Sequence, residues 1–189
     1  MKMFPINKAV IASLAIIASV IVTLSVWVLS GNFHSPQYAG QQTREVKSLS
    51  SDRVAGLKAG RGLGYAKSAE LNAWPGPLHV LELADELELT SGQKKAVEVI
   101  RAEMLVEAKE LGDRLIEAEK ILDTAFHATS VSPASVEWAA LDAAMIEGKL
   151  RSVHLVAHLK TRPLLSAKQQ SIYQAKRGYG NGHHGHAGH

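Results

Sequence analysis

The feature that most constrains the fold is a long helical repeat of apolar residues that begins shortly after residue 90. Apolar side chains recur every three or four positions as far as Phe126, which is the period of one face of an α-helix. Thr90 suits the N-cap of this helix, and Gln93, at the third helical position, can bond back to the cap in a capping box. Beyond Ser68 no segment alternates apolar and polar residues convincingly. The sequence therefore predicts an all-α fold with a helix over residues 91–126.

Two flanking helices are indicated by their first residues. Pro77 suits the first turn of a helix over 77–88, because proline lacks the N–H group that has no partner there. Ser132, as N-cap, precedes Pro133 at the start of a second long helix over 133–160.

A short final helix is predicted over 167–177. Ser166 and Gln169 repeat the capping box at its start. The helix before it ends by Thr161, because the residue preceding Pro163 disfavours helical conformation.

Charge is divided unevenly along the chain. Residues 70–126 carry six Lys/Arg against thirteen Asp/Glu, whereas residues 127–189 carry seven against three. An acidic segment followed by a basic one predicts two antiparallel elements with complementary faces, and it argues against a uniformly basic surface for nucleic acid. The chain has no cysteine, which excludes disulfides and thiolate metal ligands.

The N-terminal region is typical of a membrane-anchored protein. Residues 9–30 contain no charge and are long enough to span a bilayer as a helix. Lys2 and Lys8 precede them, so the positive-inside rule places residues 1–8 in the cytoplasm and the rest of the chain in the periplasm or exterior. We expect an uncleaved anchor over 1–30; the alternative is a long cleaved signal sequence that leaves a soluble periplasmic protein.

The remaining boundaries follow from composition. Residues 31–68 are rich in Gly, Ser and Gln and lack apolar periodicity, which predicts a flexible linker. The glycines of GRGLGY in this stretch do not match a phosphate loop, because no strand precedes them and no Lys-Ser/Thr follows. The helical domain then covers 69–177, and a Gly/His-rich tail predicted to be disordered covers 178–189.

Two boxes of the form L-[TS]-x-x-Q, each opening a helix with a long helical hairpin between them, resemble the LTxxQ signature of the Spy/CpxP-type periplasmic proteins. The resemblance is stronger to the membrane-anchored periplasmic heavy-metal sensors related to them. It is carried by residues 69–93, 151–159 and 164–180 and by the His-rich end. The second box has Ser166 in place of threonine, which preserves the hydroxyl group.

This resemblance implies a hook-like four-helix domain, often dimeric, whose two long helices form an antiparallel hairpin. It also implies two alternative functions. The first is a sensor or stress adaptor that binds a divalent transition metal (Zn, Cu, Ni or Co) and signals or buffers it, with an anti-sigma factor or sensor kinase as regulatory partner. The second is an ATP-independent chaperone that holds unfolded clients. No nucleophile–base set and no H-E-x-x-H motif is present, so we do not expect an enzyme.

Histidines indicate where a metal would bind. His154 and His158 lie four residues apart on one helical face, so both imidazoles can reach one metal ion. Across the turn between the first two helices, His79 faces the region of Glu103 and Met104, which offers a third ligand together with a carboxylate or a thioether. The alternative is structural: histidines bonded to neighbours or water, a core methionine and a solvated glutamate.

The tail offers a second, less ordered group of ligands. Imidazoles on a flexible glycine-rich chain bind divalent metals without fixed geometry. The tail histidines are His183, His184, His186 and His189.

Overall fold

The computed structural model describes residues 37–127 and 130–179, and within them it is all-helical with no strand, as the sequence predicts. The helices, all in a compact unit that starts at Thr43, are α2 (Ser51–Lys58), α3 (Lys67–Glu70), α4 (Pro77–Glu82), α5 (Ser91–Ala125), α6 (Pro133–Thr161), a 3-10 turn η1 (Arg162–Leu164) and α7 (Ala167–Lys176). The predicted anchor over 9–30 and the four tail histidines lie outside the described residues. Among those that are described, no helix is long and apolar enough to cross a membrane.

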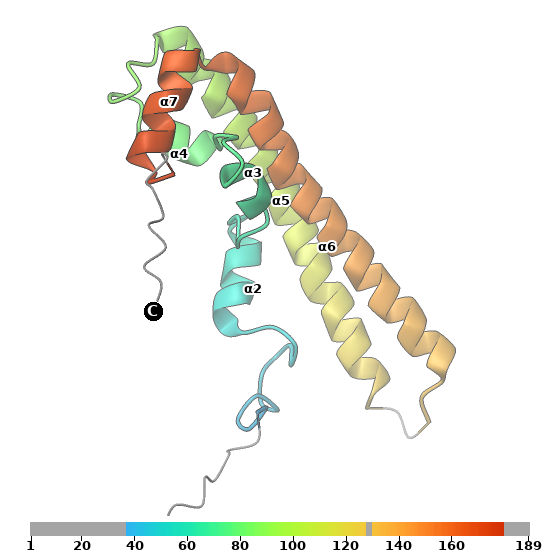
Figure 1. Cartoon of the computed structure of the whole chain (residues 1–189). Coiled ribbons are helices and arrows are strands. Elements are labelled where there is room, and N and C mark those ends of the chain that lie inside the picture. Colours follow the sequence, from blue (N-terminus) through green and yellow to red (C-terminus); the bar gives the residue numbers. More distant parts are fainter. Residues whose placement is uncertain (1–36, 128–129, 180–189) are drawn as a thin grey trace, which may run out of the picture. The chain divides into compact units, whose positions relative to one another are not determined.

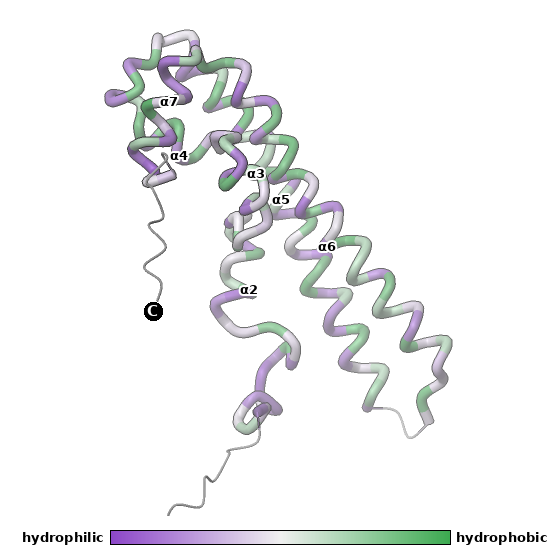
Figure 2. The backbone as a smooth tube through the Cα atoms, viewed as in Figure 1, coloured by the Kyte–Doolittle hydropathy of each residue, from purple (hydrophilic) through white to green (hydrophobic). Residues whose placement is uncertain are grey.

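The two longest helices, α5 and α6, run side by side as an antiparallel hairpin (Figure 1). Their N-caps are the predicted ones, because the side chains of Thr90 and Ser132 accept hydrogen bonds from the backbone of the first turn. Green and purple alternate along both helices in Figure 2, as expected where one face is buried and the other is exposed. The buried side chains between them include Ala108, Leu115, Ile116, Ala143, Ile146 and Leu150.

The prediction of a flexible linker is wrong for the part of that stretch that belongs to the helical unit, residues 43–68. Val46, Leu57 and Tyr65 are buried in the same core as the hairpin, and α2 packs against α5. The approach is close at Gly112, where an added Cβ would lie 2.4 Å from the carbonyl oxygen of Leu57. Apolar residues here occur in short groups, such as Val46 with Leu49 and Val54 with Leu57, and not in a continuous repeat, so the sequence pattern did not reveal that they face the hairpin.

The first predicted helix is shorter than expected. It ends at Glu82 rather than at residue 88, and the chain continues in turns with Glu88 in the left-handed region at φ 49°. The turns carry Leu87 into a second core with Val80 and Tyr173. Burial of these side chains offsets the loss of the last helical turn.

The two capping boxes meet in space, which the sequence could not show. Each glutamine closes its own box and then bonds across to the other. Gln93 Nε2 donates to Gln169 Oε1 at 2.9 Å, and Gln169 Nε2 donates to Gln93 Oε1 at 3.1 Å. The same two amides also donate to the carbonyl oxygens of Leu164 and Leu87. The motif therefore joins the starts of α5 and α7 as well as capping each helix.

Candidate functional site

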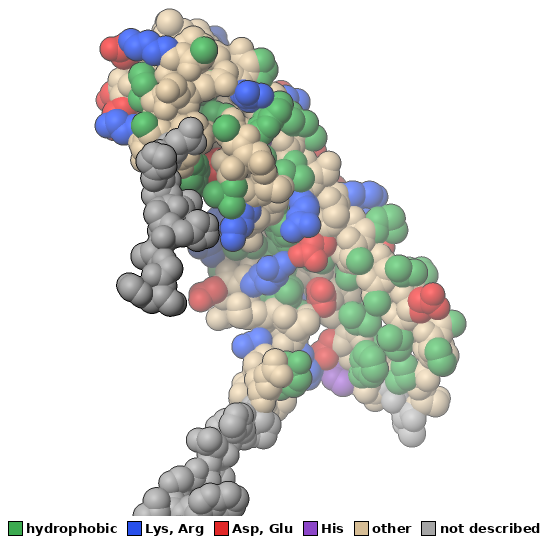
Figure 3. All heavy atoms as spheres, in the orientation of Figure 1, with side chains coloured by type: hydrophobic (Ala, Val, Ile, Leu, Met, Phe, Trp, Pro, Cys, Tyr) green, Lys and Arg blue, Asp and Glu red, His purple; other side chains and the backbone are tan. Residues whose placement is uncertain are grey.

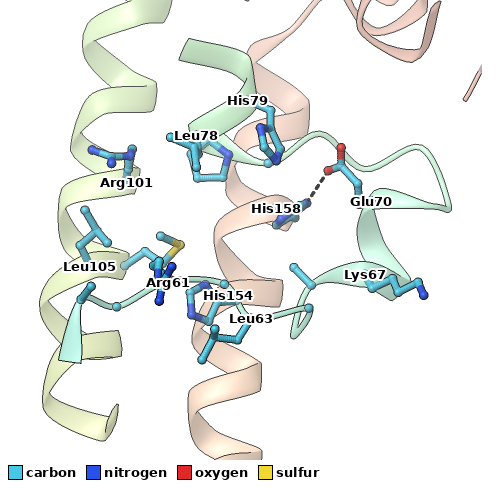
Figure 4. Close-up of a pocket in the computed structure, with 18 residues that line it drawn as sticks. Arg61, Leu63, Lys67, Glu70, Leu78, His79, Arg101, Leu105, His154 and His158 are labelled. Carbon is cyan, nitrogen blue, oxygen red and sulfur yellow. Dashed lines mark ion pairs between the residues drawn. The ribbon is translucent and has the colours of Figure 1, made fainter. Parts of the chain in front are cut away.

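A cavity of about 460 Å³ lies between α5, α6, α3, the start of α4 and the loop that precedes α3 (Figure 4). Four of the five predicted ligands of the helical domain line it: His79, Met104, His154 and His158. Glu103 does not, because its carboxylate lies 3.3 Å from Lys160 Nζ beside a separate groove between α5 and α6. His79 therefore lines the same cavity as the α6 histidines, whereas Glu103 points elsewhere.

His158 is held in one orientation by the backbone. Its Nδ1 donates to the carbonyl oxygen of Trp74 at 2.7 Å, and the same nitrogen lies 3.8 Å from Glu70 Oε2. Gly76 leaves room for the ring, since a Cβ there would lie 2.6 Å from its Cε1 and Nε2 atoms. With the proton on Nδ1, the lone pair of Nε2 is free to accept a hydrogen bond or to bind a metal.

His154 is almost completely buried, with 3% of its surface exposed. Its ring stacks on Tyr65, and its Nε2 has no hydrogen-bond partner among the described residues. Burial, and then the neighbouring His158, lower the pKa of His154, so its imidazole is neutral at pH 7. Tyr65 is itself fixed by a hydrogen bond to Glu147 at 2.9 Å. Burying an imidazole nitrogen without a hydrogen bond lowers the stability of the fold, which a purely structural role does not explain.

Glu70 is the residue that the sequence pattern missed. It is buried, and its Oε1 accepts from Tyr173 Oη at 2.6 Å and from Arg177 Nε at 3.2 Å. Its Oε2 faces His158 and has no hydrogen-bond partner within the described part of the chain. No motif surrounds Glu70; only the fold brings this carboxylate beside the histidines.

The predicted ligands in the cavity do not converge on one point. His79 Nδ1 donates to Glu82 Oε2 at 2.7 Å on α4 itself, and its ring is one-third exposed. In residues 37–127 and 130–179, no three His, Cys, Asp or Glu side chains stand close enough to hold one metal ion. Side-chain rotation into the cavity is needed to bring them together.

Comparisons with protein families, with curated proteins and with solved structures gave no match. The resemblance to the LTxxQ proteins therefore depends on the motifs quoted above.

Proposed function

We propose that this protein is a metal-binding sensor or stress adaptor, not an enzyme, anchored in the inner membrane with its helical domain in the periplasm. The observation that best supports this proposal is the lining of one cavity by three histidines and by a glutamate, one of whose carboxylate oxygens has no hydrogen-bond partner in the described part of the chain. They come from α3, α4 and α6: Glu70, His79, His154 and His158.

The chemical types of these side chains are those that bind divalent transition metals. Imidazole and carboxylate suit Zn, Ni and Co, and the thioether of Met104 on the facing helix adds a soft ligand that suits copper. His158 already donates its Nδ1–H to a backbone carbonyl, which is how proteins commonly fix the tautomer of a metal-ligating histidine. In this proposal the carboxylate ligand is Glu70 and not Glu103, which the sequence pattern suggests.

Glu70 also suggests how binding would be signalled. Its Oε1 accepts hydrogen bonds from Tyr173 and Arg177, near the end of α7, while its Oε2 faces His158. A shift of the carboxylate toward the cavity lengthens the bonds to α7 and loosens that helix. We propose that an anti-sigma factor or sensor kinase responds to this change.

Titration of the full-length protein with Zn, Ni, Co and Cu tests the ordered site. Because the tail is expected to bind metal by itself, its four histidines are first changed to asparagine. In that background, His154→Asn with His158→Asn should weaken binding about 100-fold or more. The matched control is His127→Asn, an exposed histidine just beyond the C-terminal end of α5. Equal affinity in the double variant and the control would refute the ordered site.

A second function, an ATP-independent chaperone, is favoured by a different surface. α6 exposes apolar side chains at helical spacing on one face, and hydrophobic atoms are visible along the hairpin in Figure 3. These residues are Trp138, Leu141, Met145, Val156 and Leu159. The same stripe is a surface for unfolded clients or for the second subunit of the expected homodimer.

The chaperone proposal is tested with metal-free protein. Suppression of client aggregation should persist in the His154→Asn, His158→Asn variant and be reduced by Leu141→Gln with Met145→Gln. Sedimentation of the same proteins separates loss of a dimer from loss of client binding. No suppression by the unsubstituted protein would contradict the chaperone function.

A further inference from the structure

Positively charged side chains outnumber negatively charged ones in the lining of the cavity, whereas a metal site needs neutral or negative ligands. Arg61, Lys67 and Arg101 line the cavity, against a single carboxylate, that of Glu70, which is already paired with Arg177. In the described part of the chain, no carboxylate lies within ion-pair distance of these three cations. Figure 4 places Arg61 and Arg101 on the α5 side of the cavity, away from Glu70. Such a lining favours an anion over a bare dication.

The size and the walls of the cavity indicate an organic ligand. A volume of about 460 Å³ corresponds to about fifteen water molecules and falls in the range of small-molecule pockets. Between the polar groups the lining is apolar, formed by Leu63, Leu78, Met104 and Leu105. A single inorganic ion leaves most of this apolar surface without contacts, whereas a short hydrocarbon chain covers it.

The glycine-rich loop that matched no phosphate motif forms part of the same wall. Gly60, Leu63 and Gly64 are in the left-handed region, at φ 66°, 44° and 82°. For Leu63 this conformation is strained, and it is held by packing of the side chain over Gly56, where an added Cβ would lie 2.6 Å from Leu63. Within the described residues, the N–H groups of Gly62, Leu63 and Gly64 donate to no acceptor. Successive unpaired N–H groups in such turns favour anions.

Arg61 is oriented by the same loop. One of its guanidinium nitrogens donates to the carbonyl oxygen of Asp52 at 3.1 Å, which leaves its remaining N–H groups available. His154 also lines the cavity and supplies a buried imidazole whose Nε2 has no hydrogen-bond partner among the described residues. The cavity therefore combines cationic, hydrogen-bonding and apolar walls.

We propose that this cavity binds a small organic carboxylate with a short apolar chain. The carboxylate lies between Arg61, Arg101 and the free N–H groups of the loop, and the chain lies against Leu78 and Leu105. The proposal does not depend on the metal site, although a bound anion would offset the charge that opposes a dication.

Calorimetric titration of the full-length, metal-free protein tests it. The chelator must be removed first, because common chelators are themselves polycarboxylates. Hexanoate is the probe. Hexylamine, which carries a similar chain with a positive charge, controls for the carboxylate, and acetate, which lacks the chain, controls for the apolar contacts. Hexanoate should bind, with hexylamine and acetate each about 10-fold weaker or more. Arg61→Gln and Arg101→Gln should each weaken hexanoate by about 10-fold, and Arg114→Gln, exposed on α5 outside the cavity, should not.

The outcomes separate this site from the metal site. Loss of a cationic charge should raise the affinity for Zn in Arg61→Gln and Arg101→Gln, while His154→Asn lowers it. Arg61→Lys, which keeps the charge, should retain part of the hexanoate binding. This variant distinguishes loss of the charge from a folding defect in Arg61→Gln. Equal binding of hexanoate and hexylamine, no binding of hexanoate, or unchanged binding in both glutamine variants would overturn the proposal, whatever the result with metals.

Discussion

Gln169→Glu is the substitution that best separates local from tertiary effects in this fold. Gln169 occupies the third position of α7, where a glutamate is locally favourable, because it closes a capping box and lies near the positive end of the helix dipole. Local reasoning therefore predicts a gain of about 0.3–1 kcal/mol in stability. The tertiary structure predicts the opposite.

The magnitude follows from the bonds of the amide. Gln169 is buried, and its Nε2 donates to Leu87 O and to Gln93 Oε1, both at 3.1 Å. Its Oε1 accepts from Ser166 N at 2.8 Å and from Gln93 Nε2, and a carboxylate keeps both of these bonds. Leu87 O loses its donor, at about 1–3 kcal/mol, whereas Gln93 Oε1 keeps the bond from Thr90 N and loses one hydrogen bond of about 0.5–1.5 kcal/mol. After the local gain of about 0.3–1 kcal/mol, we expect a net loss of about 0.5–4 kcal/mol at pH 7.

Urea unfolding of the full-length protein followed by circular dichroism measures this loss. The control is Gln174→Glu, which makes the same chemical change on the same helix at a side chain whose Nε2 has no hydrogen-bond partner in the described residues. Lowering the pH to about 4 should restore part of the stability of the Gln169 variant, because a protonated carboxyl group again donates one hydrogen bond. A variant as stable as the original protein at pH 7 would refute the idea that the two boxes hold each other.

Three further predictions concern stability. Burial lowers the pKa of His154 below its unfolded value of about 6.5, so the unfolded chain binds that proton more tightly than the folded protein does. The stability that is present above this pH therefore falls as the pH is lowered. In metal-free protein, His154→Leu should reduce the difference between the urea midpoints at pH 7.5 and pH 5.5. Gly112→Ala should lower the free energy of unfolding in urea by about 1–3 kcal/mol, because the added Cβ would meet the backbone of α2. Gly148→Ala on α6, where no atom lies within 4 Å of an added Cβ, should raise it by about 0.5–1 kcal/mol. Tyr173→Phe should cost about 1.5–3 kcal/mol by the same assay, since it removes a buried hydroxyl that donates to the Glu70 carboxylate, and a cost below about 0.5 kcal/mol would contradict that bond.

Local signals in the sequence were sufficient for the starts of the helices from α4 onward. Thr90, Ser132 and Ser166 cap where the sequence predicts, because a capping hydrogen bond spans only three residues. The periodic apolar face of α5 was equally visible, since a helix repeats its buried positions at short range. The residues before Ser68 gave no such signal, because their packing depends on where the hairpin surface lies and not on their own spacing.

The candidate site was predictable only in part. His154 and His158 share a face by helical geometry alone, and the turn before α5 brings His79 to the same cavity. Glu70 could not be found in this way, because its role depends on contacts with Tyr173 and Arg177, more than a hundred residues away.

The sequence by itself determined the all-α class, the starts of the helices from α4 onward and the pair of histidines on α6, because each depends on hydrogen bonds or periodicities within a few residues. Only the tertiary structure decided that the two glutamine caps bond to each other, that the supposed linker enters the core, and that Arg61 and Arg101 line the cavity with the histidines. These features join segments far apart in the chain, and their free energy depends on burial and distance, which local sequence patterns do not encode.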